Sequence, residues 1–214
     1  MKYMIFDMDG VLLDSETGAF EMYRESLQLI GIDVTLETLL HDYVGMTSPA
    51  IAKEILEKYG SKKTVEEFLA FHRSRGSYYE ISDEVKPMEG LLDFLDMLKG
   101  NGVRMAVVSS TSSRNVLTAL NRMKILSYFD AVVCGDVLNN SKPNPEGYLK
   151  AVEYLEAKKE ECVIVEDSAI GIQAGKNAGI YVVGYKGAAH IQDTSEADME
   201  VFSYSELKKN LIKC

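Results

Sequence analysis

Residues 3–15 have the sequence YMIFDMDGVLLDS, and the interpretation of the rest of the chain depends on this stretch. Its first four residues are apolar, which is the length and character of a buried strand. Asp7 and Asp9 follow, and Gly10 permits the tight backbone of a loop that leaves a strand. Carboxylates at that position suit a hard cation such as Mg2+, and one of them can also be a nucleophile. On these residues alone, a strand followed by a solvated acidic turn is the alternative.

The composition is that of an ordinary globular protein, with 214 residues, 46% of them hydrophobic and 26% charged. This length allows one large domain or a core domain with a smaller insertion. The net charge of -10 argues against a nucleic-acid partner, and no apolar run approaches membrane-spanning length. The N-terminus lacks a basic segment followed by a signal-type apolar core. We therefore expect a soluble cytoplasmic protein that is a monomer or a weak homo-oligomer, with no nucleic-acid or membrane partner.

The three cysteines, Cys134, Cys162 and Cys214, have no metal-ligand spacing. Two of them lie in or beside apolar runs that resemble strands. We expect buried free thiols in a reducing compartment rather than disulfide bridges.

The segment from Ser15 to Glu84 has helical periodicity, and none of it is typical of a strand. Helices are expected at residues 16–30, 36–44 and 50–59, and from residue 64 to about residue 75 or 79. Thr64 and Glu67 form a capping box for the fourth of these helices. The segment is therefore expected to be an all-helical unit, which by its size is a plausible small domain.

From Val85 onward, strands alternate with helices. Strands are expected at residues 2–6, 103–108, 131–134, 162–165 and 181–183, and helices at 91–99, 145–155, 169–178 and 205–212. A further helix after Ser113 is expected to turn Val116, Leu117, Leu120 and Met123 inward. This alternation predicts an α/β fold with a parallel sheet covered on both faces. Residues 1–14 and 85–214 would form this core, and residues 15–84 would be inserted into it.

Ligands of open parallel sheets bind beyond the carboxyl ends of the strands. Ser109 follows the strand at 103–108, and its hydroxyl and the neighbouring backbone N–H groups would start a helix and form an anion site. A plain helix cap is the alternative role for residues 109–113.

Lys142 and the pair Glu166-Asp167 supply the other polar groups. Lys142 lies in the sequence NSKPNP, whose prolines restrict the backbone before the next helix. Glu166 and Asp167 follow the strand at 162–165 and would lie near Asp7 if their strands are neighbours, although capping the next helix is the simpler role. Asp7, Asp167 and a backbone carbonyl could hold Mg2+, and Lys142 could keep Asp7 ionised and nucleophilic. Lys142 and the serine could bind phosphoryl oxygens.

With these motifs in order, the chain resembles the phosphohydrolases of the haloacid dehalogenase superfamily, in the branch with a helical cap after the first motif. Residues 7–11 (DMDGV) match the first motif, Ser109 the second, Lys142 the third and Glu166-Asp167 the fourth. The match spans the whole chain. It implies a Rossmann-like sheet, with residues 15–84 as the cap domain.

The resemblance also implies a role for each motif residue. Asp7 would attack phosphorus, and Asp9 would first protonate the leaving oxygen and then activate water. Mg2+ would be bound by Asp7, the Asp9 carbonyl and Asp167, with Glu166 supporting the metal shell. The substrate-binding residues would be Ser109, Ser110 and Lys142.

Within the superfamily, the chain resembles the β-phosphoglucomutase-like group through Asp14-Ser15, Val44-Gly45-Met46 and residues 166–171. It departs from true mutases at Ala19, where they have a histidine, and at Val44 and Ser48, where they have basic residues that help to hold a second phosphate.

These departures favour an Mg2+-dependent phosphatase that acts on a small phosphomonoester, a sugar phosphate or a related metabolite. A phosphosugar mutase is the alternative, and a non-catalytic phosphate-binding or signalling module is a third reading. The candidates for substrate selection in the cap are Glu16, Thr17, Tyr23, Tyr43 and Met46, each of which could equally be a packing residue. No role is assigned to the histidines, His41, His72 and His190.

Overall fold

The computed structural model describes residues 2–43, 46, 48–83, 85–188 and 192–211. The chain divides into two compact units, one formed by Met1–Asp14 with Val85–Cys214 and the other by Ser15–Glu84. We call them the core unit and the helical unit. Among the helices of the described residues, none has the length and apolar character needed to cross a membrane.

The core unit contains a six-stranded sheet in which every neighbouring pair of strands is parallel. Its strands are β1 (Tyr3–Phe6), β2 (Arg104–Val108), β3 (Ala131–Val133), β4 (Cys162–Glu166), β5 (Tyr181–Tyr185) and β6 (Met199–Val201). Their order is β3-β2-β1-β4-β5-β6, so the chain builds the sheet outward from β1 on one side and then crosses to the other side. This order confirms the α/β, Rossmann-like fold, and it places the switch point between β1 and β4.

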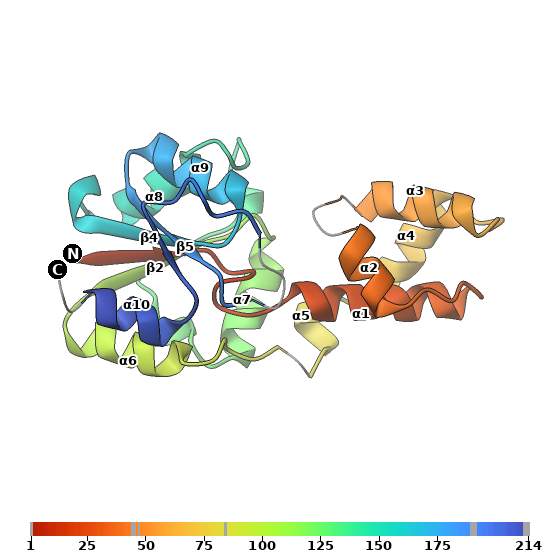
Figure 1. Cartoon of the computed structure of the whole chain (residues 1–214), viewed down its shortest axis with the longest axis horizontal. Coiled ribbons are helices and arrows are strands. Elements are labelled where there is room, and N and C mark those ends of the chain that lie inside the picture. The colour runs from red at the N-terminus through yellow and green to blue at the C-terminus, as the bar shows by residue number, and fades with distance from the viewer. Residues whose placement is uncertain (1, 44–45, 47, 84, 189–191, 212–214) are drawn as a thin grey trace. The chain divides into compact units, whose positions relative to one another are not determined.

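Helices cover both faces of this sheet (Figure 1). They are α6 (Leu91–Gly100), α7 (Ser113–Arg122), α8 (Glu146–Tyr154), α9 (Ala169–Ala178) and α10 (Tyr204–Leu211). Helices α8 and α9 lie on one face, and α6 and α10 lie on the other. Helix α9 lies close to the sheet because Gly175 has no side chain: a Cβ there would be 2.6 Å from Cγ2 of Val182.

The central strand β1 is apolar because both of its faces are covered. Met4, Ile5 and Phe6 are completely buried. Phe6 packs edge-on against Phe94, with the ring centroids 6.3 Å apart, and against Phe129 at 6.0 Å. Full burial of each such side chain contributes about 1.5–3 kcal/mol, so β1 is strongly held at the centre of the sheet.

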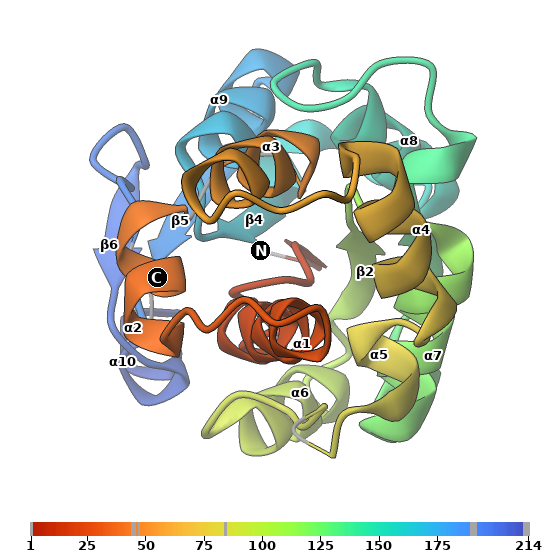
Figure 2. The ribbon, with the colours of Figure 1, turned by 90° about the vertical axis from the view of Figure 1, so that its right-hand side faces the viewer.

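The helical unit consists of α1 (Glu16–Leu29), α2 (Leu36–Asp42), α3 (Ser48–Lys58), α4 (Val65–Ser74) and α5 (Tyr78–Ile81). Figure 2 looks along α1 and α3, which run in nearly the same direction. The core of this unit includes Leu27, Ile55 and Phe68, all completely buried. Helix α5 fits against α1 at Gly18, where a Cβ would be 2.0 Å from the ring of Tyr78.

Several local expectations are confirmed. Thr64 and Glu67 form the capping box of α4. Cys134 and Cys162 are buried free thiols, whereas Cys214 lies outside the described residues. Within the described part of residues 15–84 there is no strand.

Other expectations are wrong. The sequence analysis missed β6, and Leu117 is 41% exposed rather than turned inward. The fourth helix of the helical unit was expected to end at about residue 75 or 79, and the structure bears out the first of these ends, because Gly76, with φ +98°, separates α4 from α5. Ser109 does not start a helix, since α7 begins at Ser113 with Ser112 as its N-cap. The segment from Ser109 to Ser112 is instead a loop after β2.

Candidate active site

Pairing between β1 and β4 brings the first and fourth motifs together. Phe6 lies opposite Val165, and the backbone N–H of Asp7 donates to the carbonyl of Val165 at 2.9 Å. Asp7 therefore leaves β1 directly beside the end of β4, whose last residue is Glu166 and which Asp167 follows. This is the neighbouring arrangement on which the sequence-based hypothesis of a shared site depended.

Lys142 joins Asp7 to Glu166. Its Nζ donates to Oδ1 of Asp7 and, at 2.5 Å, to Oε1 of Glu166. The Lys142 side chain is only 9% exposed, so both ion pairs are shielded from water. A buried ammonium group held between two carboxylates is not the solvated surface charge that most lysines carry.

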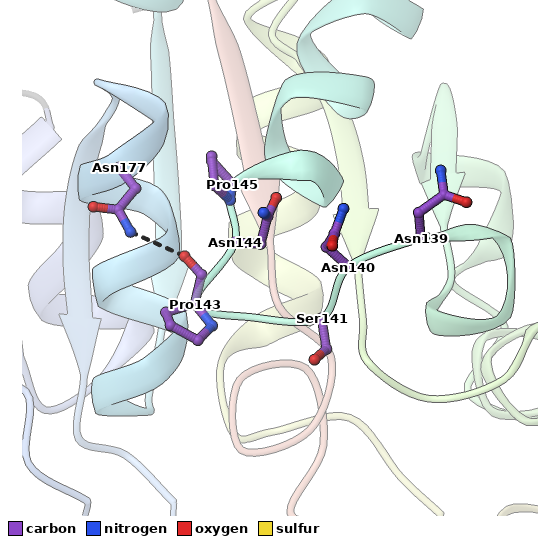
Figure 3. A pocket seen from close by; sticks show the side chains of 7 residues that line it. All are labelled: Asn139, Asn140, Ser141, Pro143, Asn144, Pro145 and Asn177. Atoms are coloured by element: carbon purple, nitrogen blue, oxygen red, sulfur yellow. Dashed lines mark hydrogen bonds between the residues drawn. The ribbon is translucent and has the colours of Figure 1, made fainter.

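The loop that carries Lys142 is fixed by its neighbours. The backbone N–H groups of Asn139 and Asn140 donate to the carboxylate of Glu146, at 3.1 and 2.9 Å. Nδ2 of Asn177, on α9, donates to the carbonyl of Pro143 at 3.0 Å (Figure 3). These contacts tie both sides of the loop to helices, and so they restrict where Lys142 can point.

Glu166 is completely buried, and both of its carboxylate oxygens are engaged. Oε1 accepts from Lys142 and from the Tyr148 hydroxyl at 3.1 Å, and Oε2 accepts from the backbone N–H and the hydroxyl of Ser168 at 2.9 and 3.0 Å. Gly171 leaves room for this carboxylate, because a Cβ there would be 1.6 Å from Oε1. Burial acts to raise the pKa of Glu166, but Lys142 and Ser168 hold it below its usual range. Glu166 is thus a fixed anion that positions Lys142.

Asp167 lies against the loop that follows β1. A Cβ at Gly10 would be 1.9 Å from Oδ2 of Asp167, and Gly10 has a φ of +78°, which favours glycine. Nε2 of Gln192 lies 3.4 Å from the same oxygen. Asp167 is 7% exposed, and its carboxylate is therefore close to the β1 loop and largely dry.

The acid cluster, defined here as Asp7, Glu166 and Asp167, would carry more negative than positive charge if all three acids were ionised. Within the described chain, Lys142 is the cation that ion-pairs with it. Burial raises the pKa of Asp7 to about 8, against the opposing effect of Lys142, and the charge of Glu166 raises it further. Burial and the neighbouring Asp7 raise the pKa of Asp167 to about 9. Burial alone would lower the pKa of Lys142, but the charges of Asp7 and Glu166 keep it well above its usual value. The cluster as it stands would gain from additional positive charge.

Asp9 is connected to the β2 loop by a residue that the sequence analysis did not single out. The Thr111 hydroxyl donates to Oδ2 of Asp9 at 3.1 Å, and the Thr111 backbone N–H donates to the Ser109 hydroxyl at 3.0 Å. Ser109 is 1% exposed, whereas Ser110 is exposed. Within the described residues, neither serine hydrogen-bonds to the acid cluster. Ser109 is therefore linked to Asp9 through Thr111.

Sequence reasoning missed Thr111, Tyr148 and Ser168 as supporting groups. Tyr148 also lies beneath Lys142, whose Nζ is 5.3 Å from its ring centroid. In the sequence Tyr148 is indistinguishable from a packing residue of an amphipathic helix, and Ser168 from a plain N-cap, which it also is. The one available signal is that Thr111 and Ser168 each lie within two residues of a predicted site residue.

The candidates for substrate selection fall in different places in the helical unit. Tyr43 is 1% exposed and belongs to the unit's core. Glu16, Tyr23 and Met46 line a cavity among α1, α3 and α4 of the helical unit. Thr17 lies in α1 but is not among the residues that line this cavity. Val44 and Gly45 lie outside the described residues, as does His190.

In the described residues, no group of three or more His, Cys, Asp or Glu side chains is arranged to hold a metal ion. Magnesium commonly binds with one or two carboxylates, several waters and the phosphate of a substrate.

Comparison with known proteins identifies the family of the chain. The family model described as haloacid dehalogenase-like hydrolase matches residues 4–185. A phosphorylated carbohydrates phosphatase of Thermotoga maritima is 32% identical over 209 residues, which cover 97% of this chain and 94% of the relative. A β-phosphoglucomutase of Bacillus subtilis is 28% identical, with 99% of this chain and 94% of the relative covered.

Among solved structures, that of a β-phosphoglucomutase candidate from Thermotoga maritima superposes with a TM-score of 0.85 at 31% identity, covering 100% of this chain and 99% of that one. The family model spans both strands that supply the acid cluster and the loop that supplies Lys142. The chain, an enzyme with phosphatases and a phosphomutase among its relatives, belongs to the haloacid dehalogenase-like hydrolase family.

Proposed function

We propose that the protein is an Mg2+-dependent phosphatase that hydrolyses a small phosphomonoester through an aspartyl-phosphate on Asp7. The observation that carries this proposal is the position of Lys142, whose buried ammonium group bridges Asp7 and Glu166 at the switch point of the sheet. A carboxylate that is to attack a phosphate must be ionised beside an anion, and a fixed cation makes both conditions easier to meet.

The reaction can be written with the groups of this chain. An oxygen of Asp7 attacks phosphorus and the bond to the leaving oxygen breaks, while Asp9 donates a proton to that oxygen. Water then attacks the phosphorus of the aspartyl-phosphate, Asp9 takes up the proton, and inorganic phosphate leaves with Asp7 restored. The hydrogen bond from Thr111 orients the Asp9 carboxylate for these proton transfers. Lys142 offsets negative charge throughout.

The residues present fit Mg2+. Asp7 and Asp167 offer carboxylate oxygens on adjacent strand ends, and burial raises the pKa of each, so a bound cation would help to keep both ionised. Glu166 is not a direct ligand in this proposal, because Lys142, Tyr148 and Ser168 engage both of its oxygens. Mg2+ bound by Asp7, Asp167 and the Asp9 carbonyl would stabilise the charge that develops on the phosphoryl group.

A phosphosugar mutase is the second candidate, favoured by the similarity to the Bacillus subtilis β-phosphoglucomutase. A mutase must also hold the second phosphate of a bisphosphorylated intermediate. The two described positions at which mutases have a histidine and a basic residue are Ala19 and Ser48 here, and neither can supply a charged donor. This difference supports the phosphatase.

The test measures phosphate release from a panel of sugar and metabolite phosphates with Mg2+, with EDTA and with Asp7→Asn. We expect EDTA to abolish turnover and Asp7→Asn to lower kcat by about 10⁴-fold or more, as removal of a catalytic nucleophile does. The matched control is Asp93→Asn, which changes an exposed acid of α6 and should retain wild-type turnover.

The outcomes separate the three candidate functions. Conversion of β-glucose 1-phosphate to glucose 6-phosphate faster than phosphate release would identify a mutase. Absence of both reactions in the wild-type protein would favour a non-catalytic binding module.

A further inference from the structure

The loop after β2, residues 109–112, lies along the chain that follows β3. The backbone N–H of Ser109 donates to the carbonyl of Val133 at 2.9 Å. Two residues further along each segment, the N–H of Gly135 donates to the carbonyl of Thr111, also at 2.9 Å. These two bonds hold the backbone of the loop on both sides of Ser110.

Gly135 lets the two segments approach closely. A Cβ at this position would be 2.1 Å from the carbonyl oxygen of Ser110. That oxygen belongs to the backbone and cannot swing aside as the end of a side chain could, so any other residue would push the two segments apart. The close contact between these segments therefore depends on the glycine.

Asp136 extends this contact to the first residue of α7. Its Oδ1 accepts from the backbone N–H of Ser113 at 2.9 Å and from the Ser113 hydroxyl at 2.6 Å. In the described chain Ser112, the N-cap residue of α7, makes no side-chain cap bond, so this end of the helix receives its side-chain acceptor from an acid 23 residues away. The two bonds from Ser113 hold the pKa of Asp136 below its usual range. Asp136 is thus an anion at neutral pH, which also suits the N-terminus of a helix.

The side chain of Thr111 connects the same loop to the proton donor of the proposed reaction. Its hydroxyl donates to Oδ2 of Asp9 at 3.1 Å. Its backbone carbonyl is held by Gly135, and the helix that begins two residues later is held by Asp136. A shift of residues 111–113 would therefore move the hydroxyl that orients Asp9.

We propose that Asp136 is a positioning residue for the general acid of the reaction: by holding Ser113, it keeps Thr111 where its hydroxyl orients Asp9. The inference rests on the proposed function, in which Asp9 protonates the leaving oxygen. Asp136 acts through two other residues and takes no part in the chemistry itself. Its removal should matter most for substrates whose leaving oxygen needs a proton.

The first arm of the test compares two aromatic phosphate esters, benzyl phosphate and p-nitrophenyl phosphate. A benzyl alkoxide is strongly basic and needs a proton as it leaves, whereas p-nitrophenolate is stable without one. The measured quantity is kcat/KM, which covers the steps up to departure of this group, and the aspartyl-phosphate formed is the same for both esters. We expect Asp136→Ala to lower kcat/KM about tenfold for benzyl phosphate and by less than about twofold for p-nitrophenyl phosphate.

Two further variants give this result its meaning. Asp136→Asn keeps an oxygen that can accept from Ser113, and it should restore part of the loss. The matched control is Asp96→Ala, at an exposed aspartate of α6 whose Oδ1 accepts from the Tyr128 hydroxyl at 2.6 Å, and it should leave both values unchanged. A loss of folded protein lowers both esters equally, so the ratio of the two values separates positioning from a structural defect.

A double-mutant cycle tests the route through Thr111. Thr111→Val removes the hydroxyl that donates to Asp9, and it should reproduce the selective loss of benzyl phosphate hydrolysis. Adding Asp136→Ala to Thr111→Val should lower kcat/KM by less than about twofold further, because the effects of two residues that act through one contact are not additive. Two losses that multiply fully would show that Asp136 does not act through Thr111.

The second arm is independent of turnover. It follows backbone amide hydrogen exchange by NMR at Thr111 and Gly135, whose N–H groups both bond within the contact between the two segments. Asp136→Ala should speed exchange at both amides about tenfold, which is the scale of one hydrogen bond, and Asp96→Ala should not.

The proposal is overturned if Asp136→Ala lowers kcat/KM equally for both esters, or if it leaves exchange at Thr111 and Gly135 unchanged. Equal hydrolysis by wild-type and Asp136→Ala proteins likewise overturns it, while the proposed function stands. A wild-type protein that hydrolyses no ester defeats the proposed function, and the exchange measurement then decides whether Asp136 holds the loop.

Discussion

The two units bury polar groups in opposite ways. In the core unit, the acid cluster shares a single ammonium group, and burial, together with the charges of the neighbouring acids, raises the pKa of Asp7 and that of Asp167. In the helical unit, the charge of Arg75 is matched by Glu25, and the Ser26 hydroxyl has a partner for its hydrogen and for each lone pair. Uncompensated charge is costly and is expected where chemistry takes place, whereas a satisfied network holds a shape. The difference supports the core unit as the place of the chemistry.

The largest effect that tests this comparison is expected from Lys142→Met. It would leave two buried carboxylates without their cation, so we expect a loss of about 3–5 kcal/mol in the free energy of unfolding, together with loss of activity. Urea unfolding followed by circular dichroism, at pH 7 with EDTA, measures the first of these quantities.

The matched control is Lys150→Met. Lys150 lies 3.8 Å from Glu146 and is 32% exposed, so its removal should cost less than about 1 kcal/mol. Equal effects of the two substitutions would mean that the ion pairs of Lys142 are no more important than a surface pair.

The pH dependence of stability tests whether the folded protein raises the pKa of Asp7 and of Asp167. Because the folded protein holds the pKa of Asp7 at about 8 and that of Asp167 at about 9, it binds more protons than the unfolded chain between about pH 4 and 9. The metal-free protein should therefore lose stability as the pH rises through this window, by on the order of 1 kcal/mol per pH unit for each group.

Asp167→Asn should make that slope shallower, and Asp93→Asn should not change it. Unfolding midpoints at pH 6, 7 and 8 in EDTA give the slopes. Glu166, whose pKa is lowered, affects only the acid side of this range. A free energy of unfolding that increases from pH 6 to pH 8 would contradict the raised pKa of Asp7 and of Asp167.

A smaller effect is expected for Gly171→Ala, which tests how closely the acid cluster is supported. The new Cβ would lie 1.6 Å from Oε1 of Glu166, and this carboxylate cannot move without leaving Lys142. We expect a loss of about 1–3 kcal/mol from overpacking. Gly100→Ala is the control, since a Cβ in this last residue of α6 meets nothing within 4 Å and should stabilise the helix slightly.

The smallest effect should come from Ser26→Ala, which breaks the satisfied network of the helical unit. We expect a cost of about 1–2 kcal/mol, because the carbonyl of Met22 and the groups of His72 and Arg75 lose a partner. Ser74→Ala removes an exposed hydroxyl of α4 that bonds only to its own helix, and should change stability by less than about 0.5 kcal/mol. A neutral Ser26→Ala would show that the network does not hold the cavity.

The fold could be predicted from the sequence wherever apolar runs were long and bounded by turn residues. The strands at the centre of the sheet, such as β1 and β4, have this character because both of their faces are buried. Strand β6 could not be recognised, because its three residues are too short to show a period and only Val201 is buried. Leu117 illustrates the opposite error, since it fits a helical stripe and yet is exposed.

The candidate site was predictable to the extent that its residues follow directly after strands. Asp7 and Asp167 do so, Glu166 is the last residue of β4, and the pairing of β1 with β4 brings the three together. Thr111 and Tyr148 act through side chains whose direction depends on tertiary packing, which no local pattern records. The same is true of His72, to which the sequence assigned no role, because its ring is held by Ser26, 46 residues away.

The central position of β1 has a consequence for synthesis on the ribosome. This strand emerges first, yet its neighbours β2 and β4 begin at Arg104 and Cys162. At about 5–20 residues per second, β1 waits roughly 10–30 seconds for the second of these partners. The helical unit, which is continuous in the chain, can fold during that interval. The edge of residues 3–6 that pairs with β4 must stay unpaired until then, and this leaves an apolar segment of the newly made chain open to aggregation.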